Sequence, residues 1–160
     1  MADTNKQLSH VDQNDLPTMV DVSSKQITER IATASATVHL GREIMQLLES
    51  GEIQTKKGPV FQTAIISGTM AVKKTADLIP FCHTLPIDSI KINIEPAGEE
   101  ALISCTVKCT AKTGVEMEAI TGASMTAITI YDMCKAISHD IVISDVKLMS
   151  KTGGKSDFKR

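Results

Sequence analysis

Two runs of alternating apolar and polar residues constrain the fold of this chain more than any other feature. Apolar residues occupy every second position over residues 90–94, and the same spacing returns over residues 103–111 after a turn that contains Gly98. A period of two indicates strands with one buried face, and the short turn joins them into an antiparallel hairpin. We expect a further strand over residues 141–148, with a break near Asp145.

Three helices are expected beside this hairpin. Apolar residues recur at intervals of three and four over residues 26–50, which predicts an amphipathic helix closed by Gly51. A second helix is predicted to begin at Pro59 and to end near Ile79, and a third to cover residues 116–138. The second is rich in small residues, which favours close packing on another helix, within the chain or across a subunit boundary. Helices segregated from an antiparallel sheet predict an α+β fold, a ferredoxin-like sandwich with the helices packed on one face.

The length and the polar segments bound the domain organisation. With 160 residues the chain fits one domain. Residues 1–18 are polar and are expected to form a flexible tail before a single domain over residues 19–160, in which residues 52–57 form an exposed loop. The first residues lack the apolar run of a signal peptide, and the longest apolar stretch is too short to cross a bilayer. We therefore expect a cytoplasmic protein with no membrane partner.

The composition excludes one class of function. The chain has 3 Phe, 1 Tyr and no Trp, so it offers few aromatic faces on which bases can stack. Its 17 basic and 19 acidic residues give a formal net charge of -2, which provides no bulk positive charge for a phosphate backbone. A nucleic-acid polymer is therefore excluded as a partner, and any anion site must be a local cluster of cations.

The four cysteines are scattered without a Cys-x-x-Cys pair. Cys105 and Cys109 have the spacing of one strand face, and we expect them to be small buried apolar residues. Disulfides are not expected in a chain without an export signal. A zinc site built from cysteine and histidine stays open as an alternative, although the spacings match no common ligand pattern.

Asp132 and Lys135 lie three residues apart on the third predicted helix, so they project from neighbouring positions of one face. A surface ion pair is one interpretation, because exposed pairs are frequent and contribute little to stability. The other interpretation is functional. The flanking residues are apolar, and ionisable groups in apolar surroundings acquire the perturbed pKa values that acid–base chemistry uses.

Glu116 and Glu118 lie at the start of the same helix. Carboxylates there suit the helix dipole, so capping is the simple interpretation. Glu118 and Asp132 are 14 residues apart, which corresponds to about 21 Å along a helix axis. One small ligand cannot touch both from the same helix. If both serve one site, either the ligand is long or the pocket combines residues of two subunits.

A short loop between two prolines carries a histidine. Phe81, Cys82 and His83 lie between Pro80 and Pro86, which restrict the backbone on both sides. A lone histidine is more often structural, but a histidine in a rigid loop is also well placed to contact a ligand.

The C-terminal segment is basic and contains two adjacent glycines. It is not a phosphate-binding loop of the G-x-x-x-x-G-K-[ST] type, because Met149 stands where that pattern needs glycine. The glycines still allow backbone N–H groups to face an anion between Lys151 and Lys155. Either some of the chain's scattered cations gather in such a pocket, or most are solvated: Arg30, Lys57, Lys73, Lys74, Lys135, Lys151 and Lys155.

Five stretches, in their order and spacing, resemble one family. They are M-V-D-V-S at residues 19–23, K-T-A-D-L-I-P-F-C-H at 74–83, K-T-G-V-E-M-E-A at 112–119, T-I-Y-D-M-C-K-A at 129–136 and K-T-G-G-K-S at 151–156. Together they resemble the cyclic pyranopterin monophosphate synthases, enzymes of early molybdenum cofactor biosynthesis. Thr84 departs from the family's usual proline, and no glycine separates Ser156 from Asp157.

The resemblance implies a ferredoxin-like subunit in a homohexamer, a trimer of dimers with active sites at the dimer interfaces. It implies a lyase that converts a small nucleotide-derived substrate, 3',8-cyclo-7,8-dihydro-GTP, to cyclic pyranopterin monophosphate with release of pyrophosphate. Residues 19–160 would form one catalytic domain, and neither a metal nor another cofactor is implied. The motifs carry over Asp132, Lys135 and Lys57 as catalytic residues, and Phe81, Cys82, His83, Met117, Glu118, Arg30 and Lys151 as substrate contacts.

A second class of function stays open beside this one. Ferredoxin-like folds also occur in non-catalytic nucleotide-binding or regulatory modules, which bind a ligand without converting it. Release of pyrophosphate separates the two hypotheses.

Overall fold

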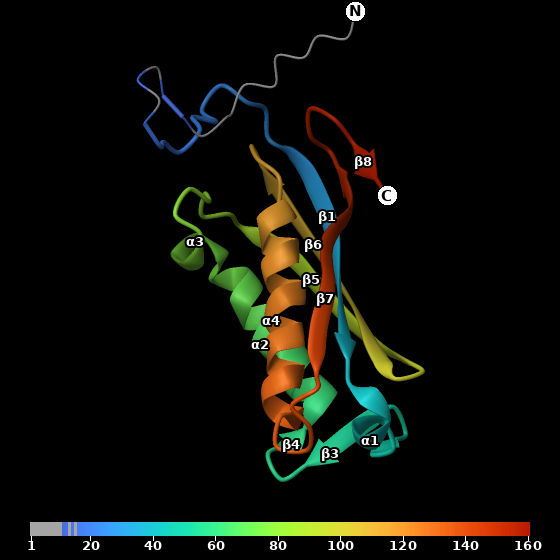
Figure 1. Ribbon diagram of the computed structural model, residues 1–160. Helices are drawn as coiled ribbons and strands as arrows, with labels where there is room; N and C mark the ends of the chain where they lie inside the picture. Colours follow the sequence, from blue (N-terminus) through green and yellow to red (C-terminus); the bar gives the residue numbers. More distant parts are fainter. Residues whose placement is uncertain (1–10, 13, 15) are drawn as a thin grey trace, which may run out of the picture.

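A five-stranded antiparallel sheet is the framework of the protein (Figure 1). The computed structural model describes residues 11, 12, 14 and 16–160, so the tail predicted over residues 1–18 lies mostly outside the described residues. The strands lie in the order β5-β6-β1-β7-β8. Their bounds are Thr28–His39 for β1, Ile87–Ala97 for β5, Glu100–Ala111 for β6, Val142–Thr152 for β7 and Phe158–Lys159 for β8.

Two long helices, α2 (Val60–Lys73) and α4 (Glu116–Cys134), cover one face of this sheet (Figure 1). The chain runs β1-α2-β5-β6-α4-β7, and the four main strands lie in the order β7-β1-β6-β5. This is the ferredoxin-like pattern, so the predicted α+β sandwich is confirmed. Among the described residues, no helix has both the length and the apolar character needed to cross a membrane.

The hairpin predicted from the alternating residues is formed by β5 and β6. The two strands pair antiparallel, with Ile92 opposite Cys105 and Ile94 opposite Ile103. Cys105 and Cys109 are buried on the core face of β6, as predicted, and all four cysteines are free. The apolar residues at every second position of β6 therefore mark the face of the sheet that the helices cover.

The helix predicted over residues 26–50 is wrong. These residues contain β1, followed by α1 (Gly41–Met45) and the short β2 (Leu48–Glu49). Ala32, Ala34, Ala36 and Val38 are buried at every second position of β1. Alanine fits helical spacing as well as alternation, so local pattern did not decide between them. Pairing with β6 on one side and β7 on the other decides for a strand, because it satisfies the backbone of β1 along both edges.

Residues 52–57 are not the exposed loop that their polarity predicts. β3 (Glu52–Thr55) pairs with β4 (Gly58–Pro59) in a short hairpin, and Ile53 on β3 is completely buried. One apolar side chain is enough to anchor an otherwise polar stretch. This hairpin lies at the end of the molecule where α4 ends (Figure 1).

The second and third predicted helices are confirmed with shifted ends, as is the break in the last strand. A short α3 (Thr75–Leu78) follows α2 after Lys74, where the Oγ1 of Thr75 donates to carbonyl oxygens of the last turn of α2. α4 ends at Cys134 rather than near residue 138. Asp145 has a φ of 52°, and the pairing of β7 with β1 shifts register nearby.

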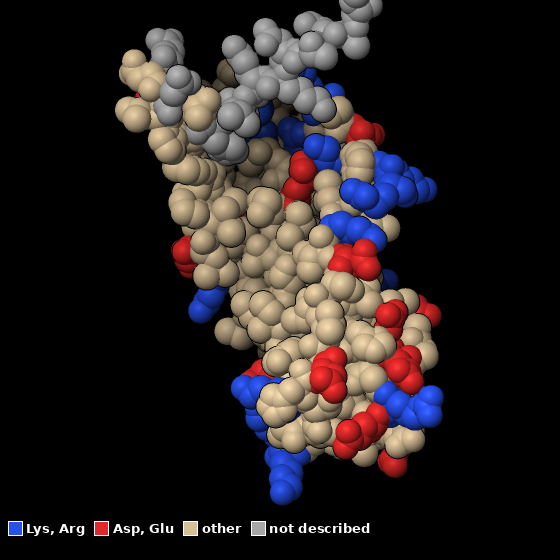
Figure 2. Space-filling model, viewed as in Figure 1, with Lys and Arg blue, Asp and Glu red and all other residues tan. Residues whose placement is uncertain are grey.

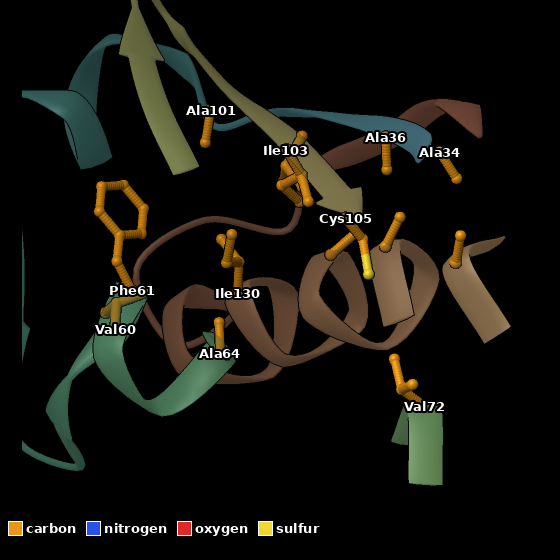
Figure 3. Close-up of a cluster of buried hydrophobic side chains, with 14 of the residues drawn as sticks. Ala34, Ala36, Val60, Phe61, Ala64, Val72, Ala101, Ile103, Cys105 and Ile130 are labelled. Carbon is orange, nitrogen blue, oxygen red and sulfur yellow. The ribbon is translucent and has the colours of Figure 1, made fainter. Parts of the chain in front are cut away.

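The core is built from small and branched side chains, with a single buried aromatic ring. Phe61 lies beside Val60 and Ala64 at the start of α2, and Ile130 of α4 packs nearby (Figure 3). The alanines of β1 face this layer. Burial is therefore obtained by close approach of the backbones rather than by large rings.

Two glycines allow that close approach. A Cβ on Gly68 of α2 would lie 2.9 Å from the carbonyl oxygen of Gly122 on α4, and would collide with the Oγ1 of Thr126. A Cβ on Gly122 would lie 2.6 Å from both Cys105 and Val72. The close helix packing predicted from the small residues of α2 is thus confirmed within the chain.

Replacing Gly68 tests this packing. Gly68→Ala is expected to lower the free energy of unfolding by about 1–3 kcal/mol, because overpacking outweighs the better helix propensity of alanine. Urea unfolding followed by circular dichroism measures the change. Gln62→Ala, on the exposed side of α2, is the control and should change stability by less than about 0.5 kcal/mol. Equal effects of the two substitutions would contradict the packing argument.

Candidate active site

A cavity of about 420 Å³ beside the N-terminal end of α4 collects one group of the predicted site residues. Phe81, Cys82 and His83 line it from the loop before β5, and Met117 and Glu118 line it from the first turn of α4. The remaining lining residues are Val20, Val22, Lys25, Leu85, Thr113, Gly114 and Glu116. The fold thus joins the proline-bounded loop to the helix end in one site.

Glu118 is the buried carboxyl group of this cavity. Its relative exposure is only 4%, and burial raises its pKa above that of an ordinary glutamate. Burial, followed by the nearby Glu118 carboxylate, also raises the pKa of the Cys82 and Cys109 thiols. Because Glu118 faces the cavity, the simple capping interpretation is insufficient. A carboxyl group with a raised pKa is suited to holding and releasing a proton.

A second cavity, of about 230 Å³, adjoins the first and is lined by cations. The two cavities share Lys25, Thr113, Gly114 and Glu116 as a common wall. Glu116 contributes a carboxylate, which binds Lys151 Nζ at 2.9 Å. The basic residues of the second cavity are Lys25, Arg30, Lys112, Lys151 and Lys155. This excess of positive charge suits a polyanionic ligand.

Arg30 is oriented in the cationic cavity by two long hydrogen bonds. It is nearly buried, and its Nε and Nη2 lie 3.4 Å from the carbonyl oxygens of Ala111 and Lys112, to which they donate. Gly153, with a φ of 82°, lets the C-terminal segment pass close to β1, since a Cβ there would collide with the carbonyl oxygen of Glu29. The glycine pair therefore brings the basic segment against Arg30.

Lys25 and Lys112 belong to this cavity although they were not predicted as site residues. Lys112 begins the K-T-G-V-E-M-E-A stretch, and Lys25 follows the M-V-D-V-S stretch, so the motifs themselves carried a signal. The Nζ of Lys112 donates to the carbonyl oxygen of Ser23 at 2.7 Å, which ties the N-terminal segment to the cavity. Lys73 and Lys74, in contrast, line neither cavity.

Asp132 lies at the other end of α4, where two lysines hold its carboxylate. Lys57 Nζ lies 2.8 Å from Oδ2 and 2.8 Å from the backbone oxygen of Asp132, while Lys135 Nζ lies 2.7 Å from Oδ1. Hydrogen bonds from Lys135 and Lys57 lower the pKa of Asp132 to about 2, and the Asp132 carboxylate raises the pKa of Lys135. Asp132 is therefore a fixed negative charge at neutral pH.

The apolar surroundings predicted for Asp132 and Lys135 are wrong. About half of each side chain is exposed, because the neighbouring Met133 and Cys134 turn into the core. The two residues form the surface ion pair that was one of the two interpretations of their spacing. Lys57, which lies 75 residues before Asp132 in the chain, joins this pair. The Asp132 carboxylate thus binds two ammonium groups, one from the end of α4 and one from the β3–β4 turn. An ordinary ion pair along a helix contains only one.

The two clusters lie at opposite ends of α4. Glu118 and Asp132 are separated by about 21 Å of helix, so one subunit does not bring them together. α2 has no charged residue before Lys73, and α4 has none between Glu118 and Asp132. Figure 2 accordingly shows a broad uncharged area over the helices, with charged side chains gathered toward the two ends.

These features together define a class of protein. A ferredoxin-like fold carries joined cavities, one cationic and one with a buried carboxyl group, together with a separate lysine–aspartate cluster. This combination is typical of an enzyme that binds a small polyanion and transfers protons. In the part of the chain that the structure describes, no group of three or more His, Cys, Asp and Glu side chains is placed to hold a metal ion.

The chain belongs to the MoaC family, whose profile matches residues 19–154. It is 54% identical to the cyclic pyranopterin monophosphate synthase of Xanthomonas campestris pv. campestris (strain 8004), over 97% of this chain and 94% of that protein. It is also 54% identical to the molybdenum cofactor biosynthesis bifunctional protein of Synechocystis sp., over 95% of this chain and 45% of that protein. The molybdenum cofactor biosynthesis protein 1 of Drosophila melanogaster is 46% identical over 96% of this chain and 27% of that protein. The resemblance predicted from the five motifs is confirmed.

The titration of Asp132 tests the lysine cluster. We expect its carboxyl group to titrate near pH 2 rather than at the ordinary 3.8, and Lys57→Ala to raise that pKa toward 3.8. The stability that the ionised carboxylate contributes is present above the ordinary pKa and is lost as the pH falls through about 2. Carbon-13 NMR of the side-chain carboxyl measures the pKa. Asp145, paired with Lys147, is the internal control, and an unchanged Asp132 pKa in the variant would contradict the assignment.

Proposed function

We propose that this chain converts 3',8-cyclo-7,8-dihydro-GTP to cyclic pyranopterin monophosphate and pyrophosphate. The family and the relatives show that it is an enzyme of molybdenum cofactor biosynthesis. The structural observation that carries the specific reaction is the joining of a cationic cavity to a cavity with a buried carboxyl group. A triphosphate with a purine-derived ring has the same two halves. We further propose that the reaction takes place in the cytoplasm, in one catalytic domain over residues 19–160.

The cationic cavity is the proposed site of the triphosphate. Ammonium and guanidinium groups form charge-assisted hydrogen bonds with phosphate oxygens. When a substrate hydroxyl gives up its proton to a base and attacks the α-phosphorus, the bond to the bridging oxygen breaks and pyrophosphate leaves with that oxygen and the bond's electrons. Arg30 and Lys151 line this cavity and would stabilise the charge that develops on that leaving group. Phosphate entry would also compete with Glu116 for Lys151.

The first cavity, which contains Glu118, is the proposed site of the purine-derived ring. Phe81 and Met117 offer apolar contact, while Cys82, His83 and Glu118 offer polar atoms. Opening one ring and closing the pyran require protons to be added and removed. The raised pKa of Glu118 suits either a proton transfer or a hydrogen bond donated to the ring.

Asp132, Lys57 and Lys135 are the proposed proton-transfer unit. A carboxylate with a pKa of about 2 is a weak base on its own at neutral pH. We therefore assign it a role with the two lysines, in which an ammonium group donates a proton to the substrate and becomes a neutral amine. Beforehand the carboxylate holds both lysines in position and favours the charged form of Lys135. Substrate that displaces one lysine from Asp132 would raise the carboxylate's basicity.

We propose that a second copy of the chain completes the site, as the dimer unit of a homohexamer. The uncharged surface of α2 and α4 exposes Ile66, Met70 and Ile128 and lies between the two clusters. A two-fold contact through this surface, with its axis perpendicular to α4, would lay two α4 helices antiparallel. The Asp132 cluster of one subunit would then approach the Glu118 end of its partner, which would close the 21 Å gap.

The reaction itself is tested by supplying the cyclised dihydro-GTP and measuring pterin product and pyrophosphate together. Asp132→Asn is expected to lower turnover by about 10²-fold or more while leaving the fold intact. Asp145→Asn, which removes the charge of another lysine-paired aspartate, is the control and should retain activity. Undiminished turnover by Asp132→Asn would refute its assigned role. Binding by the unaltered chain without pyrophosphate release would favour the non-catalytic nucleotide-binding alternative.

Complementation between two inactive variants tests the shared site. Asp132→Asn and Glu118→Gln chains, mixed under conditions that allow subunit exchange, should recover about a quarter of normal activity, because half the dimers are mixed and each has one intact site. Each variant refolded alone is the control. Absence of recovery in mixed dimers verified by mass spectrometry would refute the site shared between subunits.

A further inference from the structure

The carboxylate of Glu52 joins the β3–β4 hairpin to the first turn of α2. Its Oε1 accepts hydrogen bonds from the backbone N–H groups of Ile53 and Phe61, both at 2.8 Å, and its Oε2 accepts one from Gln62 at 3.0 Å. The first N–H groups of a helix lack partners within the helix. Pro59, at the N-cap of α2, has no side-chain group that could accept them. Glu52 supplies this function from a different element.

The hairpin that Glu52 anchors carries Lys57 at its turn. Thr55 Oγ1 accepts a hydrogen bond from the backbone N–H of Lys57 and donates one to the carbonyl oxygen of Gly58, so the turn is ordered locally. From this turn, the ammonium group of Lys57 reaches Asp132. β3 also pairs with β2, but a sheet of such short strands is marginal in isolation. The position of the hairpin therefore depends on this pairing, on the buried side chain of Ile53 and on the bonds of the Glu52 carboxylate to α2.

We propose that Glu52 is a positioning residue that holds Lys57 at Asp132. The two bonds to α2 support this role, because Glu52 itself belongs to β3, so its bonds to the N–H groups of Phe61 and Gln62 tie the hairpin to the helix. The bond to Ile53 is local and fixes the orientation of the carboxylate. The proposal rests on the proposed function in one respect, namely that Lys57 and Asp132 take part in the reaction.

A neighbouring thiol supports the placement of Glu52 close to this end of α4. Cys134 is buried two residues after Asp132, and its pKa is raised to about 11, first by burial and then by the Glu52 carboxylate. Lys57 acts on the same thiol in the opposite direction. Glu52 lies outside the five motifs that carry the family resemblance. Those motifs therefore gave no indication of its contacts with the helix.

The first test measures the pKa of Asp132 by carbon-13 NMR in Glu52→Gln and Glu52→Ala. Release of Lys57 should raise that pKa toward the value found in Lys57→Ala. Simple removal of the negative charge of Glu52 would shift it the opposite way, so the sign separates the two effects. Glu49→Gln, an exposed glutamate paired opposite Glu52 in the strand register, is the control and should leave the pKa unchanged.

Two double variants complete the test. Glu52→Ala with Lys57→Ala should give the same Asp132 pKa as Lys57→Ala alone, because Glu52 acts through Lys57. Glu52→Ala with Pro59→Ser provides a new N-cap and should recover thermal stability without recovering the low Asp132 pKa. Recovery of both would show that Glu52 is only a cap and would overturn the proposal.

Turnover supplies a separate readout. Both Glu52 variants should lose at least about tenfold in kcat, with a smaller change in KM, because Lys57 and Asp132 are assigned to proton transfer rather than to binding of the triphosphate or the ring. An unchanged Asp132 pKa in both would overturn the proposal even if activity fell. A raised pKa without any measurable lyase activity of the unaltered chain would leave the positioning role intact and refute the proposed reaction instead.

Discussion

The close approach of α2 and α4 is the constraint on which the rest of the structure depends. Gly68 and Gly122 omit the side chains that would hold the two helices apart, and Cys105 and Val72 fill the space at Gly122. With this packing, α4 lies along the sheet as one uninterrupted helix from residue 116 to residue 134. The two charged clusters occupy its ends, so the length of a rigid helix fixes their separation.

The surroundings at the two ends of α4 shift the pKa of a carboxyl group in opposite directions. Glu118 is buried, and the loss of solvation raises its pKa, whereas Asp132 is half exposed and two ammonium groups lower its pKa. One group is therefore suited to holding a proton and the other to remaining charged. In the proposed dimer the uncharged helix surface between them becomes the contact, and the site combines both kinds of carboxyl group. Glu52 adds a support of its own by fixing the hairpin from which Lys57 reaches Asp132.

Much of the fold was predictable because burial leaves a period in the sequence. The β5–β6 hairpin, α2, α4 and the break at Asp145 follow from alternation, small-residue content and turn residues. The strand β1 was not predictable in this way, since its alternating alanines also fit a helix. Within the candidate site, the motifs pointed to His83 and Asp132, and the structure places the first at a cavity and the second in a lysine cluster. Lys25 and Lys112 required the folded chain, because only their position around one cavity distinguishes them from other surface lysines.

The sequence by itself determined the α+β class, the family and the identity of most residues in the two clusters, because residue types and their spacing are local properties of the chain. Tertiary structure alone decided that β1 is the central strand, that Lys57 meets Asp132, and that five cations surround one cavity. Each of these is a contact between segments distant in the chain. Sheet pairing and helix packing determine which segments meet, and a local pattern of residues contains no information about them.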